Sequence, residues 1–151
     1  MTRTDEATLI VDASSVRVYR ALTDPESVAR WLPPEGMSGR VDRYEPRVGG
    51  TYRMVLSYDG PETGKTGDGT DIVEGRFVEV VPGVRLVQEV EFDSDDPRFS
   101  GVMRMSWIVR ARGARSEVVF RAEDVPAGIP AEDHRKGMES SLRNLAALVG
   151  R

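Results

Sequence analysis

The chain has 151 residues, no cysteine and a formal net charge of -4 at pH 7. The acidic balance argues against a nucleic-acid-binding protein, which normally carries a basic face, and the lack of cysteine excludes disulfides, thiolate metal sites and cysteine nucleophiles. The opening MTRTDEATLI is acidic where a signal peptide requires a basic region, and no apolar run is long enough to insert into a membrane, so we expect one cytoplasmic domain.

The first part of the chain predicts one strand followed by two short helices. The apolar, β-branched run ATLIVDA (7–13) favours a strand. Ser14 or Ser15 can cap the helix that follows. Asp24 and Pro25 suit the start of a second helix, because aspartate accepts free backbone N–H groups and proline fits the first helical turn. The turn sequence PPEG ends this second helix.

From Gly39 the apolar residues recur with a period of two, which is typical of strands. Turn signals such as Pro82-Gly83 and Gly113 separate five extended runs. These runs are GGTYRMVLSY (49–58), DIVEGRFVEVV (71–81), VRLVQEVEF (84–92), GVMRMSWIVRA (101–111) and SEVVFRAE (116–123). The charged segment RVDRYEPR (40–47) is interpreted as solvated surface. Strands in direct succession with short turns between them predict an antiparallel meander.

The last segment, IPAEDHRKGMESSLRNLAALV (129–149), returns to a helical period. Pro130, followed by acidic residues, suits a helix N-terminus. One stripe of this helix is expected to face inward. Its members are His134, Met138, Ser141, Leu142, Leu145, Leu148 and Val149.

The loop GPETGKTGDG (60–69) contains Gly-Lys-Thr, the end of a phosphate-binding P-loop. A P-loop also requires a glycine five residues before Gly64, where this chain has Asp59. It requires a helix after the threonine, whereas Thr66 leads into a predicted strand. The loop is therefore interpreted as a hairpin tip and not as a nucleotide site.

Four motifs, spread in order over nearly the whole chain, carry a resemblance to a known family. They are TDPESVARWLPPEGM (23–37), VGGTYRM (48–54), EGRFVEVVPGVRLV (74–87) and HRKGMESSLRNLAAL (134–148). Together they resemble the START-like (SRPBCC) superfamily, and within it the AHSA1-like group, which is related to the C-terminal domain of the Hsp90 ATPase activator. Leu32, Pro33 and Met138 stand where that group has Trp, Gly and Trp.

The resemblance implies an α+β helix-grip fold for residues 1–151 as a single START-like domain. In that fold an antiparallel sheet of about six or seven strands curves around a long C-terminal helix, and two short helices follow the first strand. The space between sheet and helix is a cleft. Methionine and aromatic side chains adapt to irregular ligands, and sparse hydroxyls or a His ring orient polar groups.

The candidate ligand-binding residues are Trp31, Tyr52, Met54, Leu56, Tyr58, Met103, Met105, Trp107, His134, Met138, Ser141 and Leu142. The alternative is that the same side chains simply fill the core, and Trp31 is equally compatible with a pocket gate and with packing of the short helices. The sequence does not decide between an open cavity and a filled one.

His134 is the only histidine and the only candidate for catalysis. As a general base it would need a carboxylate partner, and Glu74, Glu89 and Glu91 lie on predicted strands without any indication that they come close. No ligand spacing for a metal is recognisable. The sequence therefore predicts no metal and no cofactor.

Three functions remain open, because this superfamily has many. The first is a non-enzymatic domain that holds an apolar or amphipathic small molecule in the cleft. The second is an enzyme of the polyketide cyclase or dehydratase type, with His134 or a carboxylate transferring protons. The third is a protein-interaction module that acts like a co-chaperone, as the resemblance to the Hsp90 ATPase activator implies. A homodimer and a protein partner both stay open.

Overall fold

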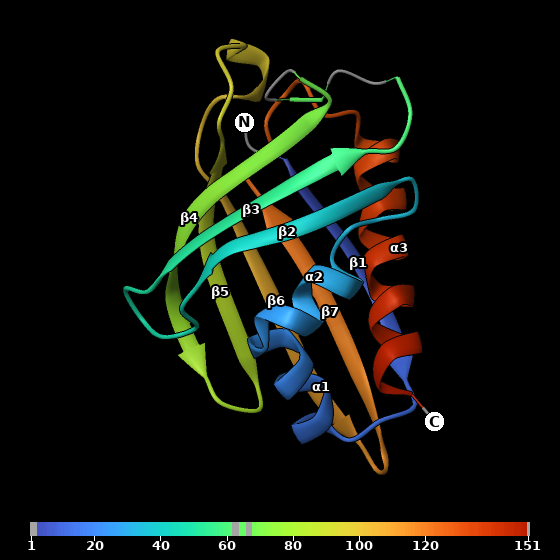
Figure 1. Ribbon diagram of the computed structural model, residues 1–151. Helices are drawn as coiled ribbons and strands as arrows, with labels where there is room; N and C mark the ends of the chain where they lie inside the picture. The colour runs from blue at the N-terminus through green and yellow to red at the C-terminus, as the bar shows by residue number, and fades with distance from the viewer. Residues whose placement is uncertain (1–2, 62–63, 66–67, 151) are drawn as a thin grey trace.

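The computed structural model describes residues 3–61, 64–65 and 68–150, drawn in Figure 1. Its elements are β1 (Thr4–Val11), α1 (Ser15–Thr23), α2 (Pro25–Trp31), β2 (Met37–Tyr44), β3 (Thr51–Tyr58), β4 (Thr70–Val81), β5 (Arg85–Phe92), the short 3₁₀ helix η1 (Pro97–Phe99), β6 (Met103–Arg112), β7 (Arg115–Glu123) and α3 (Ala131–Val149). The predicted α+β architecture is confirmed, including the two short helices after the first strand and the long C-terminal helix.

The seven strands form one antiparallel sheet in the order β1-β7-β6-β5-β4-β3-β2. Strands β2 to β7 follow one another as a meander, and β1 pairs with β7 and forms the edge of the sheet opposite β2. The register shifts between Val41 and Arg43 in β2 and between Phe77 and Glu79 in β4, and such bulges increase the local bend of a strand. Figure 1 shows the resulting curled sheet with α3 lying along its open side.

Local hydrogen bonds explain where the two short helices begin. The Ser14 hydroxyl accepts a bond from the Arg17 backbone N–H at 3.2 Å, and α1 starts at the next residue, Ser15. The Asp24 carboxylate accepts a bond from the Ser27 N–H, also at 3.2 Å, and Pro25 opens α2. Both predicted helix starts are confirmed, and Ser14 is the residue that caps α1.

The core lies between the concave face of the sheet, α3 and the two short helices. One group of aromatic rings in the core joins three elements. Trp31 of α2 packs edge-on against Trp107 of β6 with ring centroids 4.8 Å apart, and Trp107 stacks on Phe120 of β7 at 3.7 Å. These contacts hold α2 against the middle of the sheet.

Two features of the sheet differ from those expected from the sequence. Strand β1 begins at Thr4, three residues before the expected start. The segment interpreted as solvated surface contributes to β2, an edge strand. Its Arg40 and Asp42 are exposed, but the Tyr44 ring packs on Phe77 and its hydroxyl donates to the Leu22 carbonyl. The alternation of a strand was hidden there by charges on the outer face.

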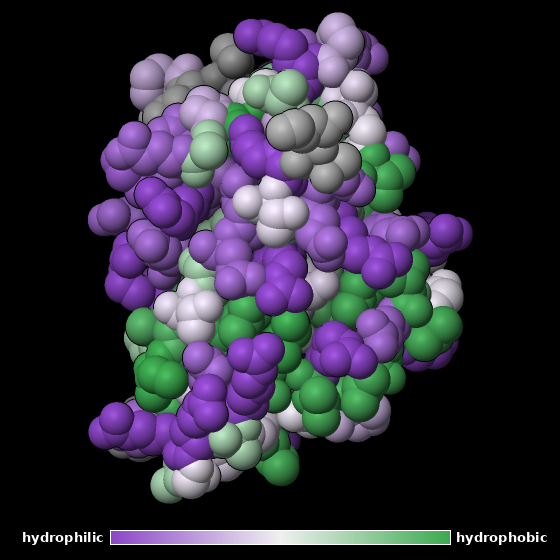
Figure 2. All heavy atoms as spheres, turned by 180° about the vertical axis from the view of Figure 1, so that it is seen from behind, coloured by the Kyte–Doolittle hydropathy of each residue, from purple (hydrophilic) through white to green (hydrophobic). Residues whose placement is uncertain are grey.

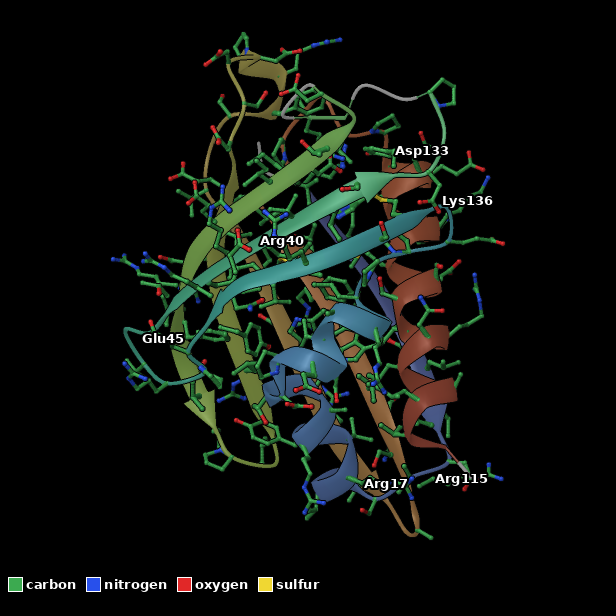
Figure 3. The ribbon with its side chains drawn as sticks, in the orientation of Figure 1. Arg17, Arg40, Glu45, Arg115, Asp133 and Lys136 are labelled. Atoms are coloured by element: carbon green, nitrogen blue, oxygen red, sulfur yellow. The ribbon has the colours of Figure 1, made fainter. Side chains whose placement is uncertain are left out.

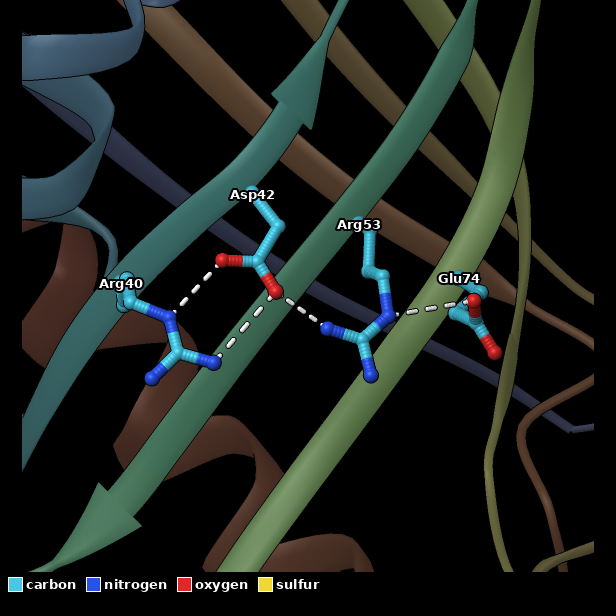
Figure 4. A network of polar contacts seen from close by, with 4 residues as sticks. All are labelled: Arg40, Asp42, Arg53 and Glu74. Atoms are coloured by element: carbon cyan, nitrogen blue, oxygen red, sulfur yellow. Dashed lines mark hydrogen bonds and ion pairs between the residues drawn. The ribbon is translucent and has the colours of Figure 1, made fainter.

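That outer face carries a chain of ion pairs across β2, β3 and β4 (Figure 4). The Asp42 carboxylate accepts from Arg40 Nε at 2.8 Å and also binds Arg53, whose Nε lies 3.3 Å from Glu74 Oε2. All four residues lie at the solvated surface, where such pairs typically contribute about 0–1 kcal/mol each. The network therefore supports strand pairing only modestly.

Seen from behind in Figure 2, polar side chains cover much of the upper surface, and apolar ones gather in the lower part. Among the residues that the structure describes, the exposed large apolar side chains are Ile10, Val16, Val48, Val84 and Val102. No helix within the described part of the chain is both long and apolar enough to cross a membrane.

Candidate functional site

A cavity of about 890 Å³ lies between the concave face of the sheet and α3. If it were dry and enclosed, it would cost about 21 kcal/mol at about 24 cal/mol per Å³. That exceeds the typical total stability of about 5–15 kcal/mol. The cavity must therefore hold water or a ligand, and its size is within the range of about 300–1,000 Å³ usual for ligand pockets.

Eight of the twelve candidate residues line this cavity: Tyr52, Leu56, Tyr58, Met103, Met105, His134, Met138 and Ser141. They come from β3, β6 and α3, which the fold brings to opposite walls. The side chains expected to point inward from the strands and from the C-terminal helix thus face each other across this cavity. Their contact with a ligand stays a prediction.

The other four candidates, Trp31, Met54, Trp107 and Leu142, are buried but do not line the cavity. Trp31 has 2% of its surface exposed, and its indole Nε1 donates to the Ala21 carbonyl at 2.9 Å. This hydrogen bond and the Trp107 contact give it a packing role between α1, α2 and the sheet. Ligand binding by these four residues has no support in the geometry.

Three polar side chains outside the candidate set lie in or behind the cavity wall: Lys65 and Asp71 line the cavity, and Asp5 contacts the lining residue His134. They are Asp5 near the start of β1, Asp71 near the start of β4, and Lys65 in the loop between β3 and β4. The start of β1, the start of α3 and the β3–β4 loop lie together at the upper end of the molecule in Figure 1. Asp133 and Lys136, labelled in Figure 3, mark the same end on α3.

His134 is held by Asp5 at this polar end. Its Nδ1 atom lies 2.7 Å from Asp5 Oδ2, and the same carboxylate oxygen binds Arg3 at 3.0 Å. Burial lowers the pKa of His134; the hydrogen bond and charge of Asp5 oppose this, while the charges of Arg3 and Lys65 add to it. The imidazole is therefore neutral at pH 7.

The tautomer of His134 follows from its partner. A carboxylate accepts hydrogen bonds, so Nδ1 carries the proton and Nε2 carries the lone pair. Nε2 makes no hydrogen bond to any residue that the structure describes. Asp5 is thus the carboxylate partner of the histidine.

None of the three glutamates considered from the sequence is the carboxylate partner of His134. Glu74 binds Arg53, and Glu89 binds both Arg76 and Arg104 on the outer face of the sheet. Glu91 is exposed on the same strand, β5. Their side chains alternate away from the cavity because successive residues of a strand point to opposite faces.

Lys65, Asp71 and Tyr58 form a second polar cluster in the cavity wall. Lys65 Nζ lies 2.9 Å from Asp71 Oδ2 and 3.4 Å from the Tyr58 hydroxyl, which itself donates to Asp71 at 2.9 Å. The Lys65 backbone N–H also donates to Asp71 Oδ1 at 2.6 Å. Asp71 is 3% exposed, so these bonds compensate for the removal of its carboxylate from water.

The Gly-Lys-Thr loop therefore contributes to the cavity without being a P-loop. It connects β3 and β4, which pair antiparallel, and a strand follows it as expected. The residues at 62–63 and 66–67, Thr66 among them, lie outside the described part of the chain. Lys65 itself turns its ammonium group inward over the Phe92 ring, 5.1 Å from the centroid.

The serines of α3 attach the helix to the segment that follows α2. Ser141 Oγ donates to the Leu32 carbonyl at 2.6 Å, and Ser140 Oγ accepts from the Glu35 N–H at 2.9 Å. Asn144 Nδ2 donates to the Pro33 carbonyl at 3.0 Å. Ser141 borders the cavity, but its proton is used in this attachment.

The two-residue alternation of apolar side chains along a strand could have indicated that Asp5 and Asp71 point inward. Asp5 is in phase with Ala7 and Val11 on the inward face of β1, and Asp71 is in phase with Val73 on β4. Lys65 offered no such signal because it lies in a loop. Among residues 3–61, 64–65 and 68–150, no three His, Asp or Glu side chains gather closely enough to hold a metal ion.

Comparison with known proteins identifies relatives of this chain. The family model described as Activator of Hsp90 ATPase homolog 1-like protein matches residues 12–150. Protein CV1439 from Chromobacterium violaceum is 33% identical, and its structure matches 98% of this chain and 97% of its own with a TM-score of 0.86.

More distant structures share the fold. A protein from Rhodobacter sphaeroides is 21% identical, with a TM-score of 0.75 over 98% of this chain and 97% of its own. DynU16, from the dynemicin biosynthetic locus, is 19% identical, with a TM-score of 0.68 over 95% of this chain and 46% of its own. No curated protein matches this chain. The chain belongs to the Activator of Hsp90 ATPase homolog 1-like family, within the START-like (SRPBCC) superfamily.

Proposed function

We propose that this protein binds a small amphipathic molecule in the cavity between the sheet and α3. The observation that carries the proposal is the mixed composition of the cavity wall. Tyr52, Met103 and Met105 are among its apolar side chains, and Lys65 and His134 are polar groups close enough to interact electrostatically. An apolar pocket with a few convergent polar groups is the usual composition of a small-molecule site.

Burial of the ligand's apolar surface would supply the binding free energy, at roughly 25 cal/mol per Å² before the costs of association. The methionine and aromatic walls can adapt to a flat or branched ring system. His134 Nε2 and the Lys65 ammonium would hydrogen-bond the ligand's polar end. The ligand would thus lie with its polar group toward the β3–β4 loop.

A thermal-shift screen of the purified, delipidated protein tests this proposal. The panel holds fatty acids, isoprenoids, flavonoids and polycyclic aromatic ketones. A ligand present at about a hundred times its Kd adds about 2.7 kcal/mol, and a domain of this size gains about 2–4 °C for each kcal/mol. We expect a rise of several degrees for one chemical class. A flat response across all four classes would contradict the proposal.

An enzyme of the cyclase or dehydratase type is the second candidate. The specific observation in its favour is the His134–Asp5 pair, since a carboxylate that orients a neutral histidine is a common general-base arrangement. The resemblance of the fold to DynU16, from a biosynthetic locus, is compatible with it. A protein-interaction role has no comparable observation, since no contact of the described residues points to a partner chain.

A further inference from the structure

We infer that the polar end of the cavity is an acid–base site for enolisable carbonyl compounds, in which His134 Nε2 is the general base and the Lys65 ammonium stabilises the enolate oxygen. The inference rests on the proposed function, because the carbonyl compound must first bind in the cavity. It adds a substrate class and a proton-transfer role for two residues.

The geometry provides the base. Asp5 Oδ2 binds Nδ1 of His134 at 2.7 Å, which fixes the ring and keeps the lone pair on Nε2. His134 lines the cavity, and Nε2 has no hydrogen-bond partner among the residues described. A molecule in the cavity is therefore the available partner for this nitrogen. Asp5 acts through the histidine and is a positioning residue.

Burial keeps this base in its active form. The pKa of His134 is lowered, chiefly by burial, so the imidazole stays unprotonated at neutral pH. The charged groups around it are Asp5 and Arg3 on the β1 side and Lys65 on the loop side. Asp5 then favours the imidazolium that forms during proton transfer.

Lys65 provides the electrophilic partner. An ammonium group has three N–H donors. Among the described residues, Asp71 and Tyr58 accept two of them, at 2.9 and 3.4 Å. The third can donate to a ligand oxygen. The Lys65 side chain is only 19% exposed and its charge is paired with Asp71, so it would act on the enolate oxygen as an oriented hydrogen-bond donor largely removed from water.

The step is balanced without a co-reactant. Nε2 takes a proton from the carbon next to the ligand carbonyl, and the C–H electron pair becomes a C=C bond. The carbonyl π pair moves to oxygen, which accepts a hydrogen bond from Lys65. The imidazolium then returns the proton to the same carbon, or to the γ carbon of a β,γ-unsaturated ketone, and the carbonyl re-forms.

Hydrogen–deuterium exchange of a ketone measures this step directly. The probes are 2-tetralone, an apolar bicyclic ketone with acidic C1 protons, and 2-dodecanone, a linear one. Loss of their α-proton NMR signals is followed in D₂O at neutral pH with and without the protein. Positioned general bases typically contribute about 10²–10⁴-fold, so we expect exchange at least roughly 10²-fold faster than in buffer.

Variants assign the roles. His134→Gln should return the rate to that of buffer. Lys65→Met should lower it by at least tenfold. Asp5→Asn should also lower the rate and should shift its pH profile, which a purely structural role would not do. Asp12→Asn, at the exposed other end of β1, is the matched carboxylate control and should change nothing.

Circular dichroism and thermal unfolding show which variants remain folded, and only those are interpreted. Saturable binding of a ketone without accelerated exchange, or exchange that is unchanged in folded His134→Gln, would overturn the acid–base inference and leave ligand binding intact. If neither ketone binds, the inferred substrate class is wrong. If, in addition, none of the four ligand classes raises the unfolding temperature in the thermal-shift screen, the proposed function is also wrong.

Discussion

The Nδ1 atom of His134 lies 2.7 Å from the Oδ2 atom of Asp5, across a separation of 129 residues in the chain. This contact joins the first turns of α3 to the first strand at the polar end of the cavity. Because His134 is the only histidine in the chain, its protonation can be followed without interference.

Protonation of His134 should destabilise the fold. Its pKa in the folded chain is lowered from 6.5, mainly by burial. As the pH falls through 6.5, the unfolded chain therefore binds a proton that the folded chain does not yet bind. The stability that neutral His134 contributes is complete above pH 6.5, decreases below it, and levels off under the folded pKa.

Urea unfolding of the wild type and of His134→Gln between pH 5 and 8 measures this effect. The free energy of unfolding of the wild type should fall more steeply below pH 6.5 than that of the variant. The difference between the two curves isolates His134 from the other titrating groups. A difference that stays constant, or that grows toward acid pH in favour of the wild type, would contradict the burial argument.

Asp5→Asn should lower the pKa of His134 further. The Asp5 carboxylate raises that pKa both by its hydrogen bond and by its charge, and the substitution removes the charge while preserving the shape. The measurement is a titration of the single imidazole by proton NMR. Asp12→Asn should leave the titration unchanged. An equal or higher pKa in Asp5→Asn would show that the contact does not form in solution.

Met138→Trp should fill the cavity. Met138 is 2% exposed and lines the cavity from α3, so a larger side chain there would extend into the cavity. We expect the affinity for any ligand found in the screen to fall at least tenfold while the fold persists. Glu139→Trp, one residue further on the exposed face of α3, is the control. Equal affinities of the two variants would place the ligand elsewhere.

Trp31→Phe should destabilise the protein through one hydrogen bond. Residue 25 is proline and has no N–H to bond the Ala21 carbonyl, four residues earlier in α1; Trp31 Nε1 donates to it instead. The substitution leaves that buried carbonyl without a donor, at a cost of about 1–3 kcal/mol. Chemical denaturation gives the value, and a loss below about 0.5 kcal/mol would show that another donor replaces the indole.

Two glycine substitutions should have opposite effects. A Cβ at Gly75 in β4 would lie 2.0 Å from the Glu89 carbonyl oxygen of β5, so Gly75→Ala forces the strands apart. A Cβ at Gly137 meets nothing closer than Pro34 Cβ at 4.0 Å. Gly137→Ala should therefore stabilise α3 by about 0.5–1 kcal/mol. In thermal unfolding, the midpoint temperature of Gly75→Ala should lie below that of the wild type, and that of Gly137→Ala above it.

Local sequence signals determined the elements of this fold. Ser14 and Asp24 cap the two short helices where the sequence places them, and the period-two runs after Gly39 form successive antiparallel strands. These features depend on neighbours within a few residues, so a single chain displays them directly. Four motifs along the chain also indicated the family.

Periodicity determined which face of an element points inward, but not what a residue meets there. Tyr52 and Met54 lie on the same face of β3, yet only Tyr52 lines the cavity. Trp31 and Trp107, chosen as ligand contacts, pack against each other instead. The depth of a side chain depends on how the sheet curls around α3, and that curvature is a property of all seven strands.

Only the tertiary structure determined which polar side chains meet at the end of the cavity. Asp5 lies outside the strand expected at 7–13, and Lys65 lies in a loop, where its backbone N–H and its ammonium group bind Asp71. His134 meets Asp5 because β1 pairs with β7 at the edge of the sheet where α3 packs. No local pattern encodes contacts across such separations, because they form only when β1 pairs with β7 and α3 packs against them.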